Sequence, residues 1–300
     1  MLLIGWWLLP ITLFHCVPLY FSALSWRALL PRSSPLGVAA VTWIRWVRES
    51  INSLLPVGGV GGDLVSARLA HQRGVAGSQA AASMVVDVTV GVMTQLIFVV
   101  IGVVLLVIRS TDGTALLVAW TVLIGILMFV AAIAAFIAFQ HRGMLAVSTR
   151  LVRRLLPSGR SLDIENGASA IDNAVVALYR RRRDLSRAGF WRLVGWAAGT
   201  GETWLVLQFL AQPRGVVDAF ILESLGAGVR GAAFMVPGAL GLLEGSSIVF
   251  GALFGLPAEA ALAISLAKRV RELALGLPGL VAWHWVEGHR VLRRARSGIS

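Results

Sequence analysis

Charged residues are scarce in this sequence. Asp, Glu, Lys and Arg make up 14% of its 300 residues, whereas 57% of the residues are hydrophobic. A soluble protein carries roughly a quarter charged residues, and so few charges cannot form a water-facing shell around a chain of this size. The shortage argues against a soluble enzyme and predicts a polytopic membrane protein.

Sites built on cysteine, clustered histidine or catalytic motifs are also missing. The single cysteine, Cys16, excludes an internal disulfide and a cysteine-based zinc site. The five histidines are scattered, and His284 and His289 are five residues apart, whereas paired ligands on a helix lie three or four apart. No G-x-S-x-G, H-E-x-x-H or Walker motif occurs, so a hydrolase, a zinc protease and an ATP-driven pump lack visible machinery. We therefore expect no metal, no cofactor and no enzymatic activity.

Long apolar runs are abundant. About 20 apolar residues are needed to span a hydrocarbon core of about 30 Å. The first such run lacks the basic n-region and the small-residue cleavage site of a signal peptide, so we interpret it as a helix. We expect one all-α integral membrane domain over residues 1–300, with full spans at about 2–24, 80–108, 115–139, 190–211 and 262–286.

Basic residues are concentrated between two of these spans and at the C-terminus. The 27 Lys and Arg outnumber the 15 Asp and Glu, and Lys and Arg are typical of the cytoplasmic loops of membrane proteins. The segment 140–189 contains the run Arg180–Arg183, and the tail contains four further arginines. We therefore place the loop 140–189 and the C-terminus in the cytoplasm, and expect this loop to attract an anionic lipid surface rather than nucleic acid.

Two more apolar stretches, about 38–68 and 215–256, are interrupted by glycine, proline and charge. When the crossings are counted from the cytoplasmic loop, the first stretch opens from the cytoplasm and the second from outside. Paired stretches of this kind are typical of inverted repeats with a central binding site. We therefore predict two re-entrant hairpins in repeat-like halves, about 1–139 and 190–288.

The two interrupted stretches share a motif. Each has an acid seven residues after a proline, Asp63 after Pro56 and Glu244 after Pro237, with glycines between them. The glycines favour either close backbone approach to an anionic group such as a lipid phosphate or plain close packing of helices. An arginine also precedes each proline by seven or eight residues, Arg48 in the first stretch and Arg230 in the second.

Several ionisable residues are predicted at membrane depth. Each is unfavourable by about 2.5–3.5 kcal/mol on insertion scales, so each needs a partner or a water-filled path. In the first stretch, residues 45, 48, 49 and 52 share one helical face, which also fits an interfacial amphipathic helix. The charges as a whole suit either ion pairs that fix helix register or a polar path, with Asp87 and Glu202 as possible proton carriers. We take as candidate substrate-binding residues Arg45, Arg48, Glu49, Asn52, Pro56, Gly61, Gly62, Asp63, Arg230, Pro237, Gly241, Glu244, Arg271 and Glu272.

With these motifs in view, the sequence resembles the lysylphosphatidylglycerol synthase transmembrane-region family of flippase-like membrane proteins, and most closely its hopanoid-biosynthesis-associated branch. The resemblance implies a multi-pass protein of the bacterial inner membrane that moves or hands over lipids. Family members usually have one more helix before the equivalent of the segment 2–24, and the sequence departs from the family pattern at its start. Larger members carry a soluble aminoacyl-transferase domain, which we do not expect here. The likeness rests on Arg45–Pro56, Gly61–Asp63, Met235–Gly241, Glu244–Gly245, Arg271–Glu272 and Gly276–Leu280.

These observations lead to the hypothesis of a lipid transporter for a hopanoid or a phospholipid. Arginines 45, 48, 230 and 271 would guide the headgroup, and Glu49 and Glu272 would hold those arginines in place. The alternative is a membrane protein without transport activity that organises lipid-biosynthesis enzymes through its basic loop.

Overall fold

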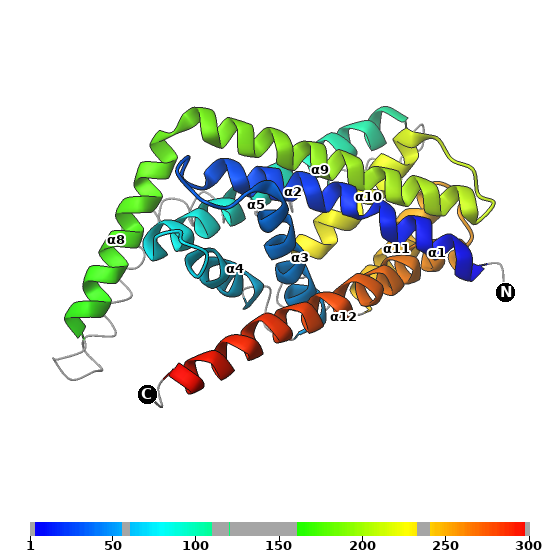
Figure 1. Ribbon diagram of the computed structural model, residues 1–300. Helices are drawn as coiled ribbons and strands as arrows, with labels where there is room; N and C mark the ends of the chain where they lie inside the picture. The colour runs from blue at the N-terminus through cyan, green and yellow to red at the C-terminus, as the bar shows by residue number, and fades with distance from the viewer. Residues whose placement is uncertain (1–3, 56–60, 110–119, 121–160, 233–240, 298–300) are drawn as a thin grey trace.

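All the regular secondary structure in the described part of the chain is helical. The computed structural model describes residues 4–55, 61–109, 120, 161–232 and 241–297, and none of these residues forms a strand (Figure 1). The all-α fold class is therefore confirmed. In chain order the helices are α1 (Ile4–Phe14), α2 (Cys16–Leu29), α3 (Val38–Leu54), α4 (Gly61–His71), α5 (Gly77–Arg109), α8 (Ser161–Arg180), α9 (Arg182–Phe209), α10 (Val216–Ala232), α11 (Leu242–Leu253) and α12 (Ala258–Ser297).

The first predicted span consists of two helices that meet at His15. Pro18 lies in the first turn of α2, and because proline has no N–H, it cannot donate to the carbonyl of Phe14. The helical hydrogen bonds continue around this point, from His15 N–H to the Ile11 carbonyl and from Leu19 N–H to the His15 carbonyl. The interruption is therefore local, and it falls in the middle of an apolar segment.

Two of the described helical segments are long and apolar enough to cross a membrane, Trp6–Leu29 and Gly77–Arg109. The expected spans 190–211 and 262–286 fall inside α9 and α12, two longer helices that carry more charge. The expected span 115–139 lies outside the described residues, apart from Trp120.

Each interrupted stretch is a pair of helices, α3 with α4 and α10 with α11. Glycine is required at the start of α4, because a Cβ on Gly62 would lie 2.5 Å from the carbonyl oxygen of Arg48 and 2.6 Å from Oδ1 of Asn52. Gly241 precedes α11 with a φ of 78°, a conformation that other residues rarely adopt. Pro56 and Pro237 lie outside the described residues, and the insertion of each pair from one side of a membrane stays a prediction.

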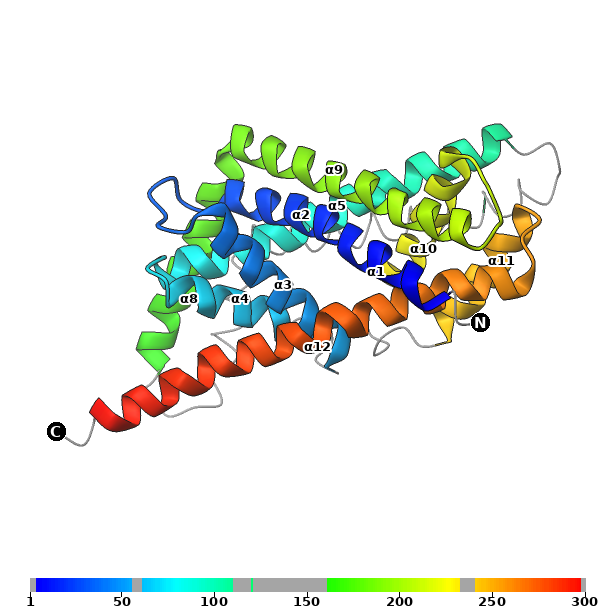
Figure 2. The same cartoon turned by 45° about the vertical axis from the view of Figure 1, so that its right-hand side comes forward.

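Helix α12 connects the two pairs. It packs against α3 and also against α11, and in both views the pair α3–α4 and the pair α10–α11 lie toward different ends of it (Figures 1 and 2). α5 likewise contacts α4, α8, α9 and α10. The largest group of buried side chains lies between α2, α3, α4 and α5 and includes the fully buried Trp26, whose indole N–H donates to Ser83 Oγ at 3.1 Å.

Part of the expected connecting loop 140–189 is helical. α8 begins at Ser161, and α9 begins at Arg182, ahead of the expected start of the span at residue 190. Arg181, with φ −82° and ψ 63°, departs from helical geometry and separates the two helices. The two helices are therefore joined directly at a basic corner, visible at the upper left of Figure 1.

Candidate functional site

Asp87 on α5 is fully buried and holds arginines from two other helices. Arg45 on α3 donates to both carboxylate oxygens, at 2.7 and 3.0 Å, and Arg192 on α9 donates to Oδ2 at 3.1 Å. Both arginines also donate to Ser22 Oγ on α2. These contacts join four helices around one buried carboxylate, although the buried Nε of Arg192 has no hydrogen-bond partner among the described residues.

Two further contacts extend this group toward α4. Arg48 on α3 donates to Asp63 in the first turn of α4 and lies 3.7 Å from Asp87. Next to it, Gly62 N–H donates to Asn52 Oδ1 at 2.8 Å. We call Arg45, Arg48, Asp63, Asp87 and Arg192 the Asp87 cluster; its three arginines outnumber its two aspartates.

A second group surrounds His15 at the junction of α1 and α2. His15 Nε2 lies 2.7 Å from Glu49 on α3, and Nδ1 lies 3.0 Å from Glu202 on α9. Arg271 on α12 donates to both oxygens of Glu202, at 2.8 and 2.7 Å, and its Nη1 lies 2.8 Å from His15 Nδ1. We call His15, Glu49, Glu202 and Arg271 the His15 cluster.

The neighbouring residue on α12, Glu272, faces another helix. It accepts from Arg230 on α10 at 2.8 Å and from Arg269, one turn before it on α12, at 3.2 Å. Arg269 also lies 3.4 Å from Glu244 at the start of α11, and Glu244 accepts from the N–H of Gly241 at 2.8 Å. These contacts join the α10–α11 pair to α12.

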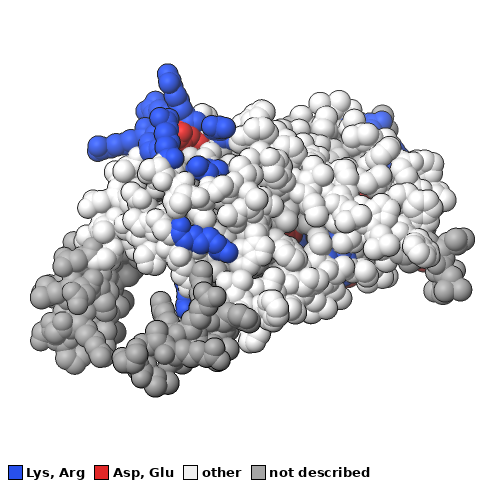
Figure 3. All heavy atoms as spheres, in the orientation of Figure 1, with Lys and Arg blue, Asp and Glu red and all other residues white. Residues whose placement is uncertain are grey.

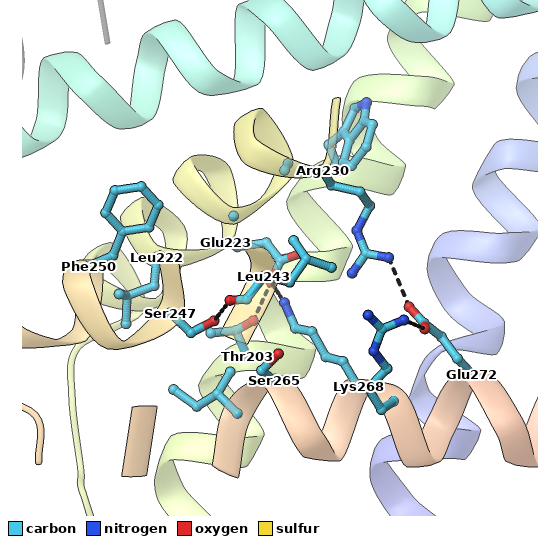
Figure 4. A pocket seen from close by; sticks show the side chains of 15 residues that line it. Thr203, Leu222, Glu223, Arg230, Leu243, Ser247, Phe250, Ser265, Lys268 and Glu272 are labelled. Atoms are coloured by element: carbon cyan, nitrogen blue, oxygen red, sulfur yellow. Dashed lines mark hydrogen bonds and ion pairs between the residues drawn. The ribbon is translucent and has the colours of Figure 1, made fainter. Parts of the chain in front are cut away.

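A small pocket lies between α9, α10, α11 and α12, and we call it the α10–α12 pocket. Inside it Lys268 donates to Glu223, and Glu223 also accepts from the hydroxyl of Thr203 (Figure 4). Arg230 and Glu272 face each other at another side of the pocket. The cavity volume is about 70 Å³, which is room for a few water molecules.

The structure places the predicted residues in these groups, with one exception in role. Asp87 and Glu202, the two candidate proton carriers, lie in different clusters with different partners, and a proton-transfer role for either stays a prediction. Glu49, expected to hold an arginine, is hydrogen-bonded to His15 instead, because the α1–α2 junction lies between α3 and α12. Whether the candidate residues bind a substrate stays a prediction. Pro56 and Pro237 lie outside the described residues, and Gly61 begins α4.

Two residues of these clusters, His15 and Arg192, were missed from the sequence, as was Arg269, which contacts Glu244 and Glu272. His15 carries a detectable signal, because a polar ring inside an apolar span is rare and needs a partner. Arg192 stands near the start of a predicted span, where an arginine is also typical of the cytoplasmic flank, so its position gives no such signal. Arg269 lies between charged residues of the same helix, and only the packing of α11 shows its partner.

Basic side chains gather at one end of the molecular surface. Arg32 and the run Arg180–Arg183 line a shallow depression there, and Figure 3 shows the corresponding patch of Lys and Arg on an otherwise largely uncharged face. Asp184 pairs with Arg181 at 2.6 Å and lies 3.8 Å from Arg32. We call these five arginines the basic surface.

Comparison with known proteins gives one result. The family model described as the lysylphosphatidylglycerol synthase TM region matches residues 3–279. No curated protein and no solved structure matches the chain significantly.

Proposed function

The chain belongs to the lysylphosphatidylglycerol synthase TM-region family, and from this premise we propose that it is a lipid transporter of the bacterial inner membrane. Membership makes it a membrane protein with a lipid-related function. The proposal adds that it moves a polar lipid, a hopanoid or a phospholipid, between leaflets or to an acceptor, and that it catalyses no reaction itself. It further assigns the C-terminus to the cytoplasm.

The observation that carries the proposal is the α10–α12 pocket. Lys268 and Arg230 lie in it on different helices, each held by a carboxylate. A phosphate-bearing headgroup offers oxygen acceptors of the same charge as Glu223 and Glu272, so it would replace them at the two cations. When the phosphate replaces the carboxylate at a cation, Lys268 and Arg230 are never left without an anionic partner. This exchange favours passage of the headgroup at membrane depth.

The size of the pocket adds a requirement. A volume of about 70 Å³ holds water rather than a complete headgroup. Headgroup binding therefore requires the α10–α11 pair to separate from α12. The ion pairs that resist separation are those of Arg269 with Glu244, of Arg230 with Glu272 and of Lys268 with Glu223. Interrupted helix pairs beside a central binding site are typical of transporters whose site opens alternately to the two sides of the membrane.

A vesicle assay tests transport. The full chain is reconstituted into vesicles of phosphatidylcholine and phosphatidylglycerol with a trace of fluorescent phosphatidylglycerol, and dithionite then bleaches the dye of the outer leaflet. We expect the protein to expose inner-leaflet lipid to bleaching, and Lys268→Gln and Arg230→Gln to slow this by about tenfold or more, since each removes a hydrogen bond to a charged group worth about 1.5–3 kcal/mol.

Arg109→Gln serves as the matched control, because Arg109 forms an exposed pair with Asp218 away from the pocket. Wild-type protein that does not accelerate bleaching, with either phospholipid or hopanoid as the labelled lipid, refutes the transport proposal. Mass spectrometry of the lipids that copurify with the chain separates hopanoid from phospholipid as the substrate.

The basic surface supports a second candidate, an accessory protein that holds lipid-biosynthesis enzymes at an anionic membrane surface. Its arginines are exposed and lie together, as attraction to acidic headgroups requires. The accessory alternative predicts that replacing Arg180–Arg183 with glutamine abolishes function in cells, whereas Lys268→Gln leaves it intact. The transport proposal predicts that Lys268→Gln reduces function more than the replacement of Arg180–Arg183 does.

A further inference from the structure

Both ring nitrogens of His15 face carboxylates that belong to different helices. Nε2 is 2.7 Å from Glu49 on α3, and Nδ1 is 3.0 Å from Glu202 on α9. The guanidinium of Arg271 on α12 also reaches Nδ1, at 2.8 Å. The ring therefore has three charged neighbours, each from a separate helix, and Glu272 lines the same small cavity.

The number of protons on the ring selects among these neighbours. A neutral imidazole has one N–H donor and one acceptor nitrogen. If Nε2–H donates to Glu49, Nδ1 accepts from Arg271, and both ring nitrogens are hydrogen-bonded. An imidazolium has two donors, so Nδ1–H must turn to Glu202, and its hydrogen bond with Arg271 is lost. In the first state Nη1 of Arg271, which carries two N–H groups, gives one to Nδ1 and the other to Glu202. In the second state both are free for Glu202, which also accepts from Nδ1–H.

The charged side chains around His15 carry an excess of negative charge. Among the described residues, the His15 cluster contains two carboxylates and one cationic side chain besides the ring, a shortfall that one proton on His15 would remove. An uncompensated charge is energetically unfavourable in a medium of low dielectric constant. The excess of negative charge around the ring therefore favours proton binding to His15. The carboxylates are Glu49 and Glu202, and the cation is Arg271.

A route for the proton also exists. The side chain of Glu49 is 44% exposed, whereas that of His15 is 13% exposed, so the carboxylate links the ring to the outside of the bundle. A cavity of about 10 Å³ between His15, Ser50 and Ser53 is close to the smallest space that holds one water molecule. Both features lie on the α3 side of the ring.

We propose that His15 is a proton-binding site, reached from the Glu49 side, whose occupancy moves the hydrogen bond of Nδ1 from Arg271 to Glu202. One proton adds to the neutral imidazole, and no other covalent bond changes. The consequence is a change in how α12 is held, because Arg271 loses its link to the α1–α2 junction. This site goes beyond the proposed transport function, and its test does not depend on it.

Nitrogen NMR of the full chain in lipid nanodiscs reads the ring directly. Histidine is labelled with ¹⁵N, and a paramagnetic tag on Cys16, the single cysteine and the exposed neighbour of His15, broadens the His15 signals and so assigns them without a variant. We expect the ring to change from one N–H to two N–H groups within about pH 5–9. A ring that keeps the same protonation over this whole range overturns the proposal.

Two variants sharpen the test. Glu49→Gln removes a carboxylate beside Nε2, so protonation should need a proton concentration about tenfold higher or more. His71→Gln is the control, because His71 on α4 contacts the Val75 carbonyl and lies outside the cluster, so the His15 titration should not move. An unchanged His15 titration in Glu49→Gln contradicts the assignment. If His15 titrates as expected and vesicles show no lipid movement, the proton site stands and the transport proposal falls.

Discussion

The carboxylate of Asp87 accepts hydrogen bonds from arginines on two different helices and is fully buried. Its removal would leave Arg45 without the partner that compensates its own burial, and Arg45 is only 2% exposed. The loss of one partner of a buried pair is more severe than the loss of the pair's net attraction, because the remaining charge stays in a medium that does not solvate it.

We expect Asp87→Asn to lower the free energy of unfolding by about 3–5 kcal/mol. The control is Asp218→Asn, which breaks an exposed pair with Arg109 and should change stability by about 0–1 kcal/mol. Chemical unfolding in detergent measures both. Equal stability of the two variants would contradict the structural role given to Asp87.

Gly62 offers a second test at the level of one residue. A methyl group there would collide with the Arg48 carbonyl and with Asn52, so Gly62→Ala should destabilise the protein by about 1–3 kcal/mol. Gly199→Ala, in α9 with no atom within 4 Å of the added carbon, should instead be neutral or stabilising by up to about 1 kcal/mol. Thermal unfolding of both variants checks the sign of each change.

Seven acids fall inside the predicted spans and interrupted stretches, away from their ends, and each has a cationic or histidine partner in the structure. They are Glu49, Asp63, Asp87, Glu202, Glu223, Glu244 and Glu272. Their partners were only partly predictable. An acid in an apolar run must be paired, which locates it, but the rule does not say with what. Glu49 could have paired with an arginine on its own helix face, and the structure pairs it with His15, whose helix junction the sequence does not place.

Among the described helices, the four expected apolar spans that fall within them and the two interrupted pairs were predictable, and α8 was not. The fifth expected span, 115–139, lies outside the described residues apart from Trp120. Length and hydropathy identify an apolar span because the membrane imposes both. Glycine and proline mark the interrupted pairs because they weaken helices. α8 and the start of α9 are polar enough to resemble a loop, and only their packing against α5 makes their position evident.

The crossing of α12 with α3 depends on small residues. A Cβ on Gly279 would overlap Ser50 Oγ and lie 3.3 Å from the ring of Trp46, whose N–H donates to the Leu275 carbonyl at 2.9 Å. We expect Gly279→Val to push the helices apart and to destabilise the chain by about 1–3 kcal/mol.

Gly245→Val is the matched control for this crossing, since a Cβ on Gly245 meets no atom within 4 Å. Native-state hydrogen exchange of α3 should quicken in Gly279→Val and stay unchanged in the control. Unchanged exchange in both variants would mean that the crossing tolerates a larger side chain, against the packing described.

For the molecule as a whole, exposed basic side chains gather at one end of the described surface rather than being spread evenly over it. The basic surface lies at one end, and much of the face seen in Figure 3 carries no charge. Composition and charge placement therefore predicted a membrane protein and a cytoplasmic end. They could not predict which helices meet, because contacts such as that of His15 with Arg271 join residues 256 positions apart.

Neutralising the basic surface should disturb orientation in the membrane. We expect replacement of Arg180–Arg183 with glutamine to reduce the fraction of chains with a cytoplasmic C-terminus, because Lys and Arg near span ends determine orientation. A C-terminal reporter that is active on only one side of the membrane measures this fraction. Replacement of the same four residues with lysine keeps the charge and should leave the fraction unchanged; a loss in both variants would point to folding instead.

Arg271 and Glu272 are consecutive on α12, yet they are hydrogen-bonded to different helices, α9 and α10. Successive side chains on a helix point about 100° apart, so their directions are rigidly related through one backbone. A twist of α12 about its own axis that frees Glu272 from Arg230 must also swing Arg271 away from Glu202. The two ion pairs are therefore coupled through the backbone of α12. Rotation of α12 that breaks the pair on one side also breaks the pair on the other.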